Sequence, residues 1–322
     1  MDTDVHATVG LAPASAQPAC MSERRLTPWL VGVCLLAVLA LPCQVLADVV
    51  WVALSRQEPA YLEAAHVLRA ALPQEDVRVG EWHDFNFKSA PPDLLVTVGS
   101  EALVQLQAAA DKTPIVALLV SRATLDKLRD TAPGRITGVY FEQPMANQAR
   151  LLRAAFPNRS RVGAILGPSS ARYRADLAQA LRRVGMESVF EVIQDKRELS
   201  EAAKKVLDNA EIFLALPDEE AVNNQTARFI LLSSYRRGIP VMGYSAAFVK
   251  AGAAVGLVSS PKHLGEEAAR MVQEALSAKR LPPPRAPMDF DVLVNPSVSR
   301  SLGLNLDASL LEKRVRGEEA PR

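Results

Sequence analysis

The sequence predicts an α/β protein built from two doubly wound parallel-sheet lobes joined by a hinge. After residue 48, short runs rich in β-branched residues alternate with longer amphipathic segments, the pattern of a parallel sheet covered by helices. The same alternation restarts after residues 136–141. Polar residues also follow the apolar strands directly, most clearly in the strand pair 239–245 and 254–260. Such residues line the edge of an open α/β sheet where ligands bind.

The composition is that of an ordinary globular protein of two domains. The chain has 322 residues, of which 49% are hydrophobic and 23% charged, and its net charge is +1. Its few pairs of basic residues stand at helical spacing, as expected for solvated helix faces. We therefore expect no nucleic-acid partner.

The first 47 residues are predicted to be a leader and signal peptide. Arg24 and Arg25 precede an apolar run at 29–41, which is followed by the small-residue pattern that ends at Ala47. Cleavage after Ala47 would give a periplasmic protein. Two alternatives stay open at this stage: a lipid-modified Cys43, or an uncleaved membrane anchor, although the apolar run is short for a span.

The sequence offers little for catalysis or metal binding. All three cysteines precede the predicted cleavage site, and the histidines beyond it stand alone, without the spacing of a metal site. Glycine-rich nucleotide loops and a nucleophile elbow are also missing from the sequence. We therefore expect no enzyme activity, no cofactor and no metal.

Residues 48–136 are predicted to form the N-terminal lobe. Strands are expected at 49–54, 77–82, 94–98 and 115–120, and helices at 61–72, 102–110 and 124–129. A strand at 136–141 marks the changeover to the next lobe.

Residues 137–280 are predicted to form the C-terminal lobe. Helices are expected at 144–155, 171–184, 199–207 and 221–235, with a short one through 248–249 and another opening at 261. Strands are expected at 162–166, 189–193, 212–216, 239–245 and 254–260. Residues 281–322 then provide a Pro-rich crossover, a last strand at 290–294 that returns toward the first lobe, and a polar tail. Two lobes with several crossings predict a hinge and a cleft.

The candidate ligand-binding residues are the polar side chains that follow the strands. Helix starts at these positions supply free amides and hydroxyls suited to an anionic or hydroxylated small molecule, although each residue alone fits an ordinary helix cap. One wall is predicted from Ser55, Gln57, Ser100 and Ser121, and the other from Ser169, Asp218, Tyr244 and Ser259. The rings near enough to stack on a ligand are Tyr61, Tyr140, Tyr173 and Tyr244.

The second half of the chain resembles the exported substrate-binding proteins of ABC transporters, of the type that binds tryptophan or tyrosine. The resemblance covers residues 135–305 well and 48–134 only through the alternation of strands and helices. It rests on short motifs in the right order, at 136–139, 144–152, 156–158, 162–166, 239–241, 252–253, 256–257, 264–265, 291–295 and 302–304.

This resemblance implies a type I periplasmic binding protein that closes on a solute and presents it to a permease. Two positions depart from the family pattern. Asp218-Glu219-Glu220 follows Pro217 where the family usually shows Pro-x-Asp-Asn, and Ser259 or Ser260 replaces a family Asp. Because an amino-acid ammonium needs a carboxylate partner, these departures weaken the case for an aromatic amino acid.

The sequence therefore favours an exported solute-binding component of an ABC-type uptake system. Its partners would be a small polar or aromatic solute and a membrane permease or outer-membrane uptake receptor, and the protein is expected to be a monomer. The alternative is an exported accessory or sensory protein that keeps the fold but not transport. An exported enzyme on the same scaffold lacks a catalytic constellation, and a DNA-binding repressor would need a helix pair where this chain has its leader.

Overall fold

The computed structural model of the protein describes residues 47–86, 91–109 and 112–317. The predicted signal peptide lies outside these residues except for Ala47, as do all three cysteines. Both lobes belong to one compact unit that begins at Ala47. Within the described ranges, no helix has the length and apolar character needed to cross a bilayer.

The first lobe is built on a five-stranded parallel sheet in the order β2-β1-β3-β4-β5. Its strands are β1 (Val49–Leu54), β2 (Asp76–Glu81), β3 (Leu94–Val98), β4 (Ile115–Val120) and β5 (Ile136–Tyr140), with a short 3-10 turn η1 (Trp82–Asp84) after β2. Alternate residues of β1 enter two different cores, so that Val50 and Val52 face one layer of helices and Trp51 the other. The sheet is therefore covered on both faces, as the sequence predicts.

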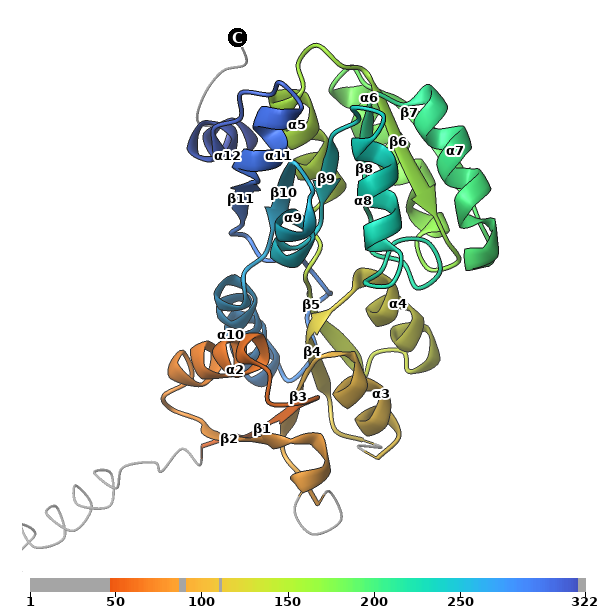
Figure 1. Ribbon diagram of the computed structural model, residues 1–322. Helices are drawn as coiled ribbons and strands as arrows, with labels where there is room; N and C mark the ends of the chain where they lie inside the picture. The colour runs from red at the N-terminus through yellow and green to blue at the C-terminus, as the bar shows by residue number, and fades with distance from the viewer. Residues whose placement is uncertain (1–46, 87–90, 110–111, 318–322) are drawn as a thin grey trace, which may run out of the picture. The chain divides into compact units, whose positions relative to one another are not determined.

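Four helices cover this sheet in two pairs (Figure 1). The helices α2 (Pro59–Ala70) and α10 (Pro261–Ala278) pack on one face. The helices α3 (Ser100–Ala109) and α4 (Arg122–Thr131) pack on the other.

The second lobe repeats this topology with one strand added. Its sheet has the order β11-β10-β9-β8-β6-β7 and is parallel except for β11. The strands are β6 (Arg161–Leu166), β7 (Glu187–Val192), β8 (Ile212–Leu214), β9 (Val241–Gly243), β10 (Val255–Val258) and β11 (Asp291–Val294). When the five parallel strands of this sheet are numbered by their order in the chain, their order across the sheet is 2-1-3-4-5, as in the first sheet.

Helices also cover both faces of the second sheet. One face carries α5 (Met145–Ala155), α6 (Arg174–Arg183) and α12 (Ala308–Arg316). The other carries α7 (Leu199–Asn209), α8 (Ala227–Tyr235) and α9 (Ala246–Ala251). Short 3-10 turns precede α6 and α7, at η2 (Ala171–Tyr173) and η3 (Lys196–Glu198), and α11 (Pro296–Ser301) follows β11. The predicted α/β class with two doubly wound lobes is confirmed.

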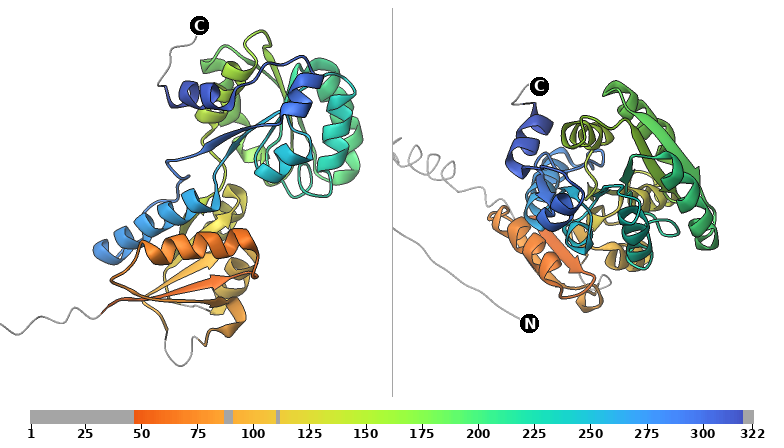
Figure 2. Two further views of the ribbon diagram at one scale, coloured as in Figure 1. Left: turned by 60° about the vertical axis from the view of Figure 1, so that its left-hand side comes forward. Right: turned by 45° about the horizontal axis from the view of Figure 1, so that its top comes forward.

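The helix α10 corrects the predicted boundary of the second lobe at residue 280. This helix follows a strand of the second sheet but packs beside α2 on the first sheet (Figures 1 and 2). The close approach needs a glycine, since a Cβ on Gly265 would lie 2.6 Å from the carbonyl oxygen of Ala64. The buried face of α10, which includes Leu264, Ala268 and Met271, supplies part of the first core. Residues 261–278 thus belong to the first lobe.

The last strand also differs from its predicted place. The Pro-rich segment lies along β5, where the Thr137 hydroxyl donates to Pro282 O at 2.7 Å and Arg285 N donates to Gly138 O at 3.2 Å. The chain then crosses back, and β11 pairs antiparallel with β10 in the second sheet. The prediction that this strand returns toward the first lobe was wrong. The chain enters the first lobe earlier, with α10, and β11 then joins the second sheet.

The predicted helix at 221–235 begins six residues late, as α8 at Ala227. Local side-chain hydrogen bonds hold the preceding residues in turns. The Asp218 carboxylate accepts from the amides of Glu220 and Ala221, and the Asn223 side chain accepts from the amides of Gln225 and Thr226. Asp and Asn compete with a helix in this way because their short side chains replace its backbone acceptors.

Candidate functional site

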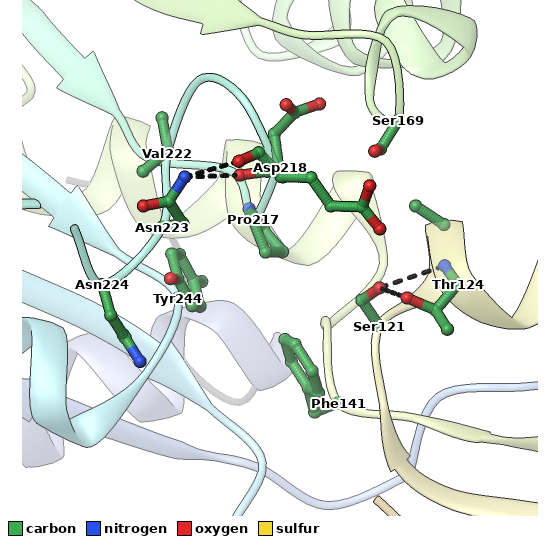
Figure 3. A pocket seen from close by; sticks show the side chains of 12 residues that line it. Ser121, Thr124, Phe141, Ser169, Pro217, Asp218, Val222, Asn223, Asn224 and Tyr244 are labelled. Atoms are coloured by element: carbon green, nitrogen blue, oxygen red, sulfur yellow. Dashed lines mark hydrogen bonds between the residues drawn. The ribbon is translucent and has the colours of Figure 1, made fainter. Parts of the chain in front are cut away.

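A cleft of about 320 Å³ lies where the carboxyl ends of strands from the two sheets face each other (Figure 3). The first lobe contributes residues from the start of α4 and the end of β5, and the second lobe contributes the loops after β6, β8 and β9. The lining residues are Ser121, Ala123, Thr124, Phe141, Ser169, Pro217, Asp218, Glu219, Val222, Asn223, Asn224 and Tyr244. The carboxyl edge of a doubly wound sheet is the usual ligand site of such folds.

Four of the eight predicted site residues line this cleft. They are Ser121, Ser169, Asp218 and Tyr244. The hydroxyl of Ser121 caps α4 by accepting from the amide of Thr124 at 3.1 Å, and it also shares a 2.8 Å hydrogen bond with the Thr124 hydroxyl. The hydroxyl of Ser169 is half-buried, and no described residue hydrogen-bonds with it.

Asp218 lines the cleft, but its carboxylate is already engaged by its own chain. One oxygen accepts from the amide of Ser170 at 2.9 Å and from its hydroxyl at 2.8 Å. The other accepts from the amides of Glu220 and Ala221 at 2.8 and 3.0 Å. A Cβ on Gly167 would lie 2.0 Å from this carboxylate, so the close contact requires the glycine. Asp218 therefore ties the loops after β6 and β8 together.

The other four predicted residues do not line the cleft. Ser55 is buried, and its hydroxyl accepts from the amide of Ala102 at 2.9 Å near the start of α3. Gln57 and Ser100 are exposed beside that helix start, outside the lining set. The cleft is formed at the ends of β4 and β5, which lie further along the first sheet than the end of β1.

Ser259 is part of the hinge. Its hydroxyl donates to Phe141 O at 2.8 Å and accepts from the side-chain amide of Gln143 at 3.1 Å. The same amide nitrogen lies 3.2 Å from Pro287 O and 3.3 Å from Asp289 O. Gln143 thus joins the three chain segments that cross between the lobes, and its side chain is 3% exposed.

An aromatic pair forms one side of the cleft. The rings of Phe141 and Tyr244 are stacked with centroids 6.3 Å apart and planes 26° from parallel, and Phe248 packs behind Tyr244 at 5.2 Å. Burial, followed by the nearby charge of Glu142, raises the pKa of Tyr244, so its hydroxyl is neutral at ordinary pH. The sequence identified Tyr244 but missed Phe141, because Phe141 ended a predicted strand and carried no polar signal.

A cluster of one arginine, two tyrosines and an aspartate links the lobes beside the cleft. The Arg122 guanidinium lies 4.5 Å from the ring centroid of Tyr173 and 5.8 Å from that of Tyr140. The Tyr173 hydroxyl donates to the Asp126 carboxylate at 2.7 Å, so a second-lobe residue is bonded to α4 of the first lobe. Of the tyrosines proposed to stack on a ligand, Tyr140 and Tyr173 therefore pack on this arginine instead.

Glu142 is a half-buried carboxylate next to the cleft residue Phe141, and the sequence did not single it out. Both of its carboxylate oxygens accept from the amide of Arg122, at 3.1 and 2.9 Å, so its charge lies at the amino terminus of α4. Burial raises its pKa from 4.5 to about 7, although the hydrogen bonds from the amides of Arg122 and of Glu142 itself oppose the rise. Its position directly after a strand was the one available signal.

We expect the stability of a Glu142→Gln variant to fall less than that of the wild type as the pH rises from about 4.5 to about 7. Because the folded pKa is raised, the folded state binds the proton more tightly than the unfolded state, and stability falls as the pH rises from about 4.5 to about 7. Glutamine cannot ionise and still offers an acceptor to the amide of Arg122. Thermal unfolding from pH 4.5 to 8 should show a flatter profile and a gain at pH 8 on the order of 1–3 kcal/mol.

The control for this measurement is Glu187→Gln, which replaces an exposed glutamate at the amino end of β7. Its pH profile should follow that of the wild type. A Glu142→Gln profile as steep as the wild type's would contradict the assignment of a raised pKa to Glu142.

The described residues hold no group of three or more His, Cys, Asp or Glu side chains placed to bind a metal ion. What the cleft offers is hydroxyls, side-chain amides, one exposed carboxylate and two rings. This arrangement can hold a small molecule by hydrogen bonds and stacking.

The fold and the family agree with comparisons to known proteins. An L-Trp complex of an ABC domain protein from Streptococcus pneumonia is 16% identical, with a TM-score of 0.59, and the match covers 83% of this chain and 98% of that one. A conserved domain protein from Vibrio cholerae is 19% identical with a TM-score of 0.57, over 83% and 98% of the two chains. A ligand-free, open substrate-binding protein with adhesive properties from Clostridium difficile is 18% identical with a TM-score of 0.59, over 81% and 97%. At these identities the three structures show a shared fold.

No curated protein matches the chain. A family profile described as ABC transporter substrate binding protein matches residues 83–316, well over half of the sequence. This match confirms the resemblance drawn from the short motifs of the second half, and extends it into the first lobe. The chain belongs to the family of ABC transporter substrate-binding proteins.

Proposed function

We propose that the protein is the exported solute-binding component of an ABC-type uptake system and binds one small polar or aromatic molecule in the cleft. The observation that carries this proposal is the cleft itself, which combines an aromatic pair with polar side chains that their own chain does not fully use. Ligand contacts are proposed for Ser121, Ser169 and Tyr244 from the predicted set, together with Phe141. A permease would receive the solute after the lobes close on it.

Export is proposed from the leader. The basic pair Arg24-Arg25, the apolar run and the small-residue end at Ala47 support a cleaved signal peptide and a periplasmic protein. Mass spectrometry of the protein from its host should find an amino terminus at Asp48. A mature protein that keeps Trp29 would contradict cleavage.

Binding is tested by titrating the protein that begins at Asp48 with a library of amino acids, nucleobases and amines. We expect at least one solute to bind, and Tyr244→Ala to weaken that binding by about tenfold or more, because the substitution removes a half-buried ring from the cleft wall. The matched control is Tyr235→Ala, which removes a 48% exposed ring on α8 and should leave the affinity unchanged. Equal losses in the two variants would contradict binding in this cleft.

The alternative is an accessory or sensory protein that has lost transport. One observation favours a protein contact: Phe229, Leu232 and Tyr235 are 39%, 44% and 48% exposed at successive turns of α8. A Phe229→Ser and Leu232→Ser double variant separates the two functions. An accessory protein should lose its activity in the host with this variant and keep it with Ser169→Ala plus Tyr244→Ala, whereas a transport component needs the cleft.

A further inference from the structure

The charge of the cleft wall is one-sided. Among the described residues that line the cleft, two are carboxylic acids, Asp218 and Glu219, and none is Lys, Arg or His. Asp218 is bonded to its own chain, but Glu219 is exposed, and no described residue hydrogen-bonds or ion-pairs with its side chain. Glu219 is therefore a free negative charge at the site.

Several backbone amides that could hold an anionic ligand are already occupied. On the first-lobe wall, the carboxylate of Glu142 accepts from the amide of Arg122 at the start of α4, and the Ser121 hydroxyl accepts from the amide of Thr124. On the second-lobe wall, the carboxylate of Asp218 accepts from three amides in the loops after β6 and β8. Such helix starts and loops otherwise form anion sites, and here each holds a carboxylate of the chain itself.

Arg122, which lies between the lining residues Ser121 and Ala123 in the sequence, does not restore an anion site. The Arg122 guanidinium is held between the rings of Tyr140 and Tyr173, and its Nε lies 3.8 Å from the Asp126 carboxylate. Arg122 is not among the residues that line the cleft. The face of an aromatic ring is itself a favourable surface for a cation, and Phe141 and Tyr244 present such rings.

We propose that the cleft selects a positively charged ligand, an amine or guanidinium on an apolar or aromatic body, and discriminates against a free carboxylate. This inference rests on the proposed function, since it requires that the cleft binds a solute. Glu219 is the specificity-determining residue: its carboxylate pairs with the ligand cation, and Phe141 and Tyr244 contact the ligand body. A zwitterionic amino acid would bring a carboxylate to walls where Glu142 and Asp218 already accept from four backbone amides.

The test compares ligands that share a body and differ only in charge. Tyramine, 4-ethylphenol, L-tyrosine and 3-(4-hydroxyphenyl)propionate form one set, and hexylamine, 1-hexanol and hexanoate form a second. Titration calorimetry at pH 7 should place the amine first in at least one set and the carboxylate last. The affinity for the amine should also fall as salt rises from 20 to about 300 mM, because the pairing with Glu219 is partly screened.

A charge variant assigns the preference to one side chain. Glu219→Gln should lower the affinity for the amine by about tenfold and leave that for 4-ethylphenol or 1-hexanol unchanged. The control Glu187→Gln removes another exposed carboxylate, at the amino end of β7, and should change neither affinity.

The outcomes separate this inference from the proposed function. Tighter binding of the carboxylate or of the zwitterion than of the amine would overturn the charge preference and leave solute binding intact. An amine preference that survives in Glu219→Gln would overturn the role of Glu219. If neither these probes nor the solute library bind, the proposed function itself fails, and the charge preference fails with it.

Discussion

Replacing Glu267 by alanine is expected to lower the free energy of unfolding by about 3 kcal/mol. This glutamate lies on α10 with its side chain 2% exposed, and its carboxylate oxygens lie 2.6 Å from the guanidinium groups of Arg270 and Arg285. Removing it leaves two partly buried cations without their shared partner. The effect should be large because Arg285 also anchors the Pro-rich crossover on β5 of the first lobe. Chemical denaturation of the wild type and the variant measures it.

The matched control is Glu274→Ala, which removes the exposed partner of the same Arg285. Exposed ion pairs contribute little, so its cost should stay below about 1 kcal/mol. Equal losses in the two variants would contradict the assignment of the stabilisation to the buried pair.

The contribution of Glu267 to stability should depend on pH. Burial alone would raise the pKa of Glu267, but the hydrogen bonds from Arg270 and Arg285 outweigh it and hold the pKa below its ordinary value. A lowered folded pKa means that the stabilisation is fully present above the ordinary carboxyl value and is lost as the pH falls through the folded value. The stability gap between the wild type and Glu267→Ala should therefore narrow in acid.

Replacing Gln143 by alanine is expected to cost about 2–3 kcal/mol. Its side-chain amide nitrogen lies within hydrogen-bond distance of Ser259, Pro287 and Asp289, and its oxygen accepts from Asn147. Alanine would remove this donor from the buried Ser259 and Pro287, at the place where three segments cross between the lobes. Unfolding by denaturant provides the measurement.

Gln194→Ala is the control for this variant, since it removes an exposed glutamine after β7 and should change stability by less than about 0.5 kcal/mol. A Gln143→Ala variant as stable as this control would contradict the view that Gln143 holds the hinge together.

Most of the strands and helices could be predicted from the sequence, because each has a strong period of its own. The strands at 49–54, 94–98 and 115–120 are confirmed to the residue, and most other boundaries move by one to three residues. The lobe on which a helix packs was harder to predict. The apolar face of α10 fits either lobe by pattern alone, and its place beside α2 depends on the close approach at Gly265, a contact between residues 201 positions apart.

The candidate site was harder still to predict. Ser55, Asp218 and Ser259 do follow strands, as reasoned, but a polar side chain at a strand end can serve its own backbone as readily as a ligand. Which of these roles it takes depends on neighbours distant in the sequence. Glu142 and Phe141 were missed because both lie in the first residues after β5, in a segment assigned to the changeover between lobes.

Native mass spectrometry of the protein purified from its host tests most directly whether the cleft between the lobes holds a small solute. We predict one small molecule bound per chain in the wild type and in Tyr235→Ala, and a clearly lower occupancy in Tyr244→Ala. A bound mass that persists in Tyr244→Ala at the wild-type level would contradict solute binding in this cleft.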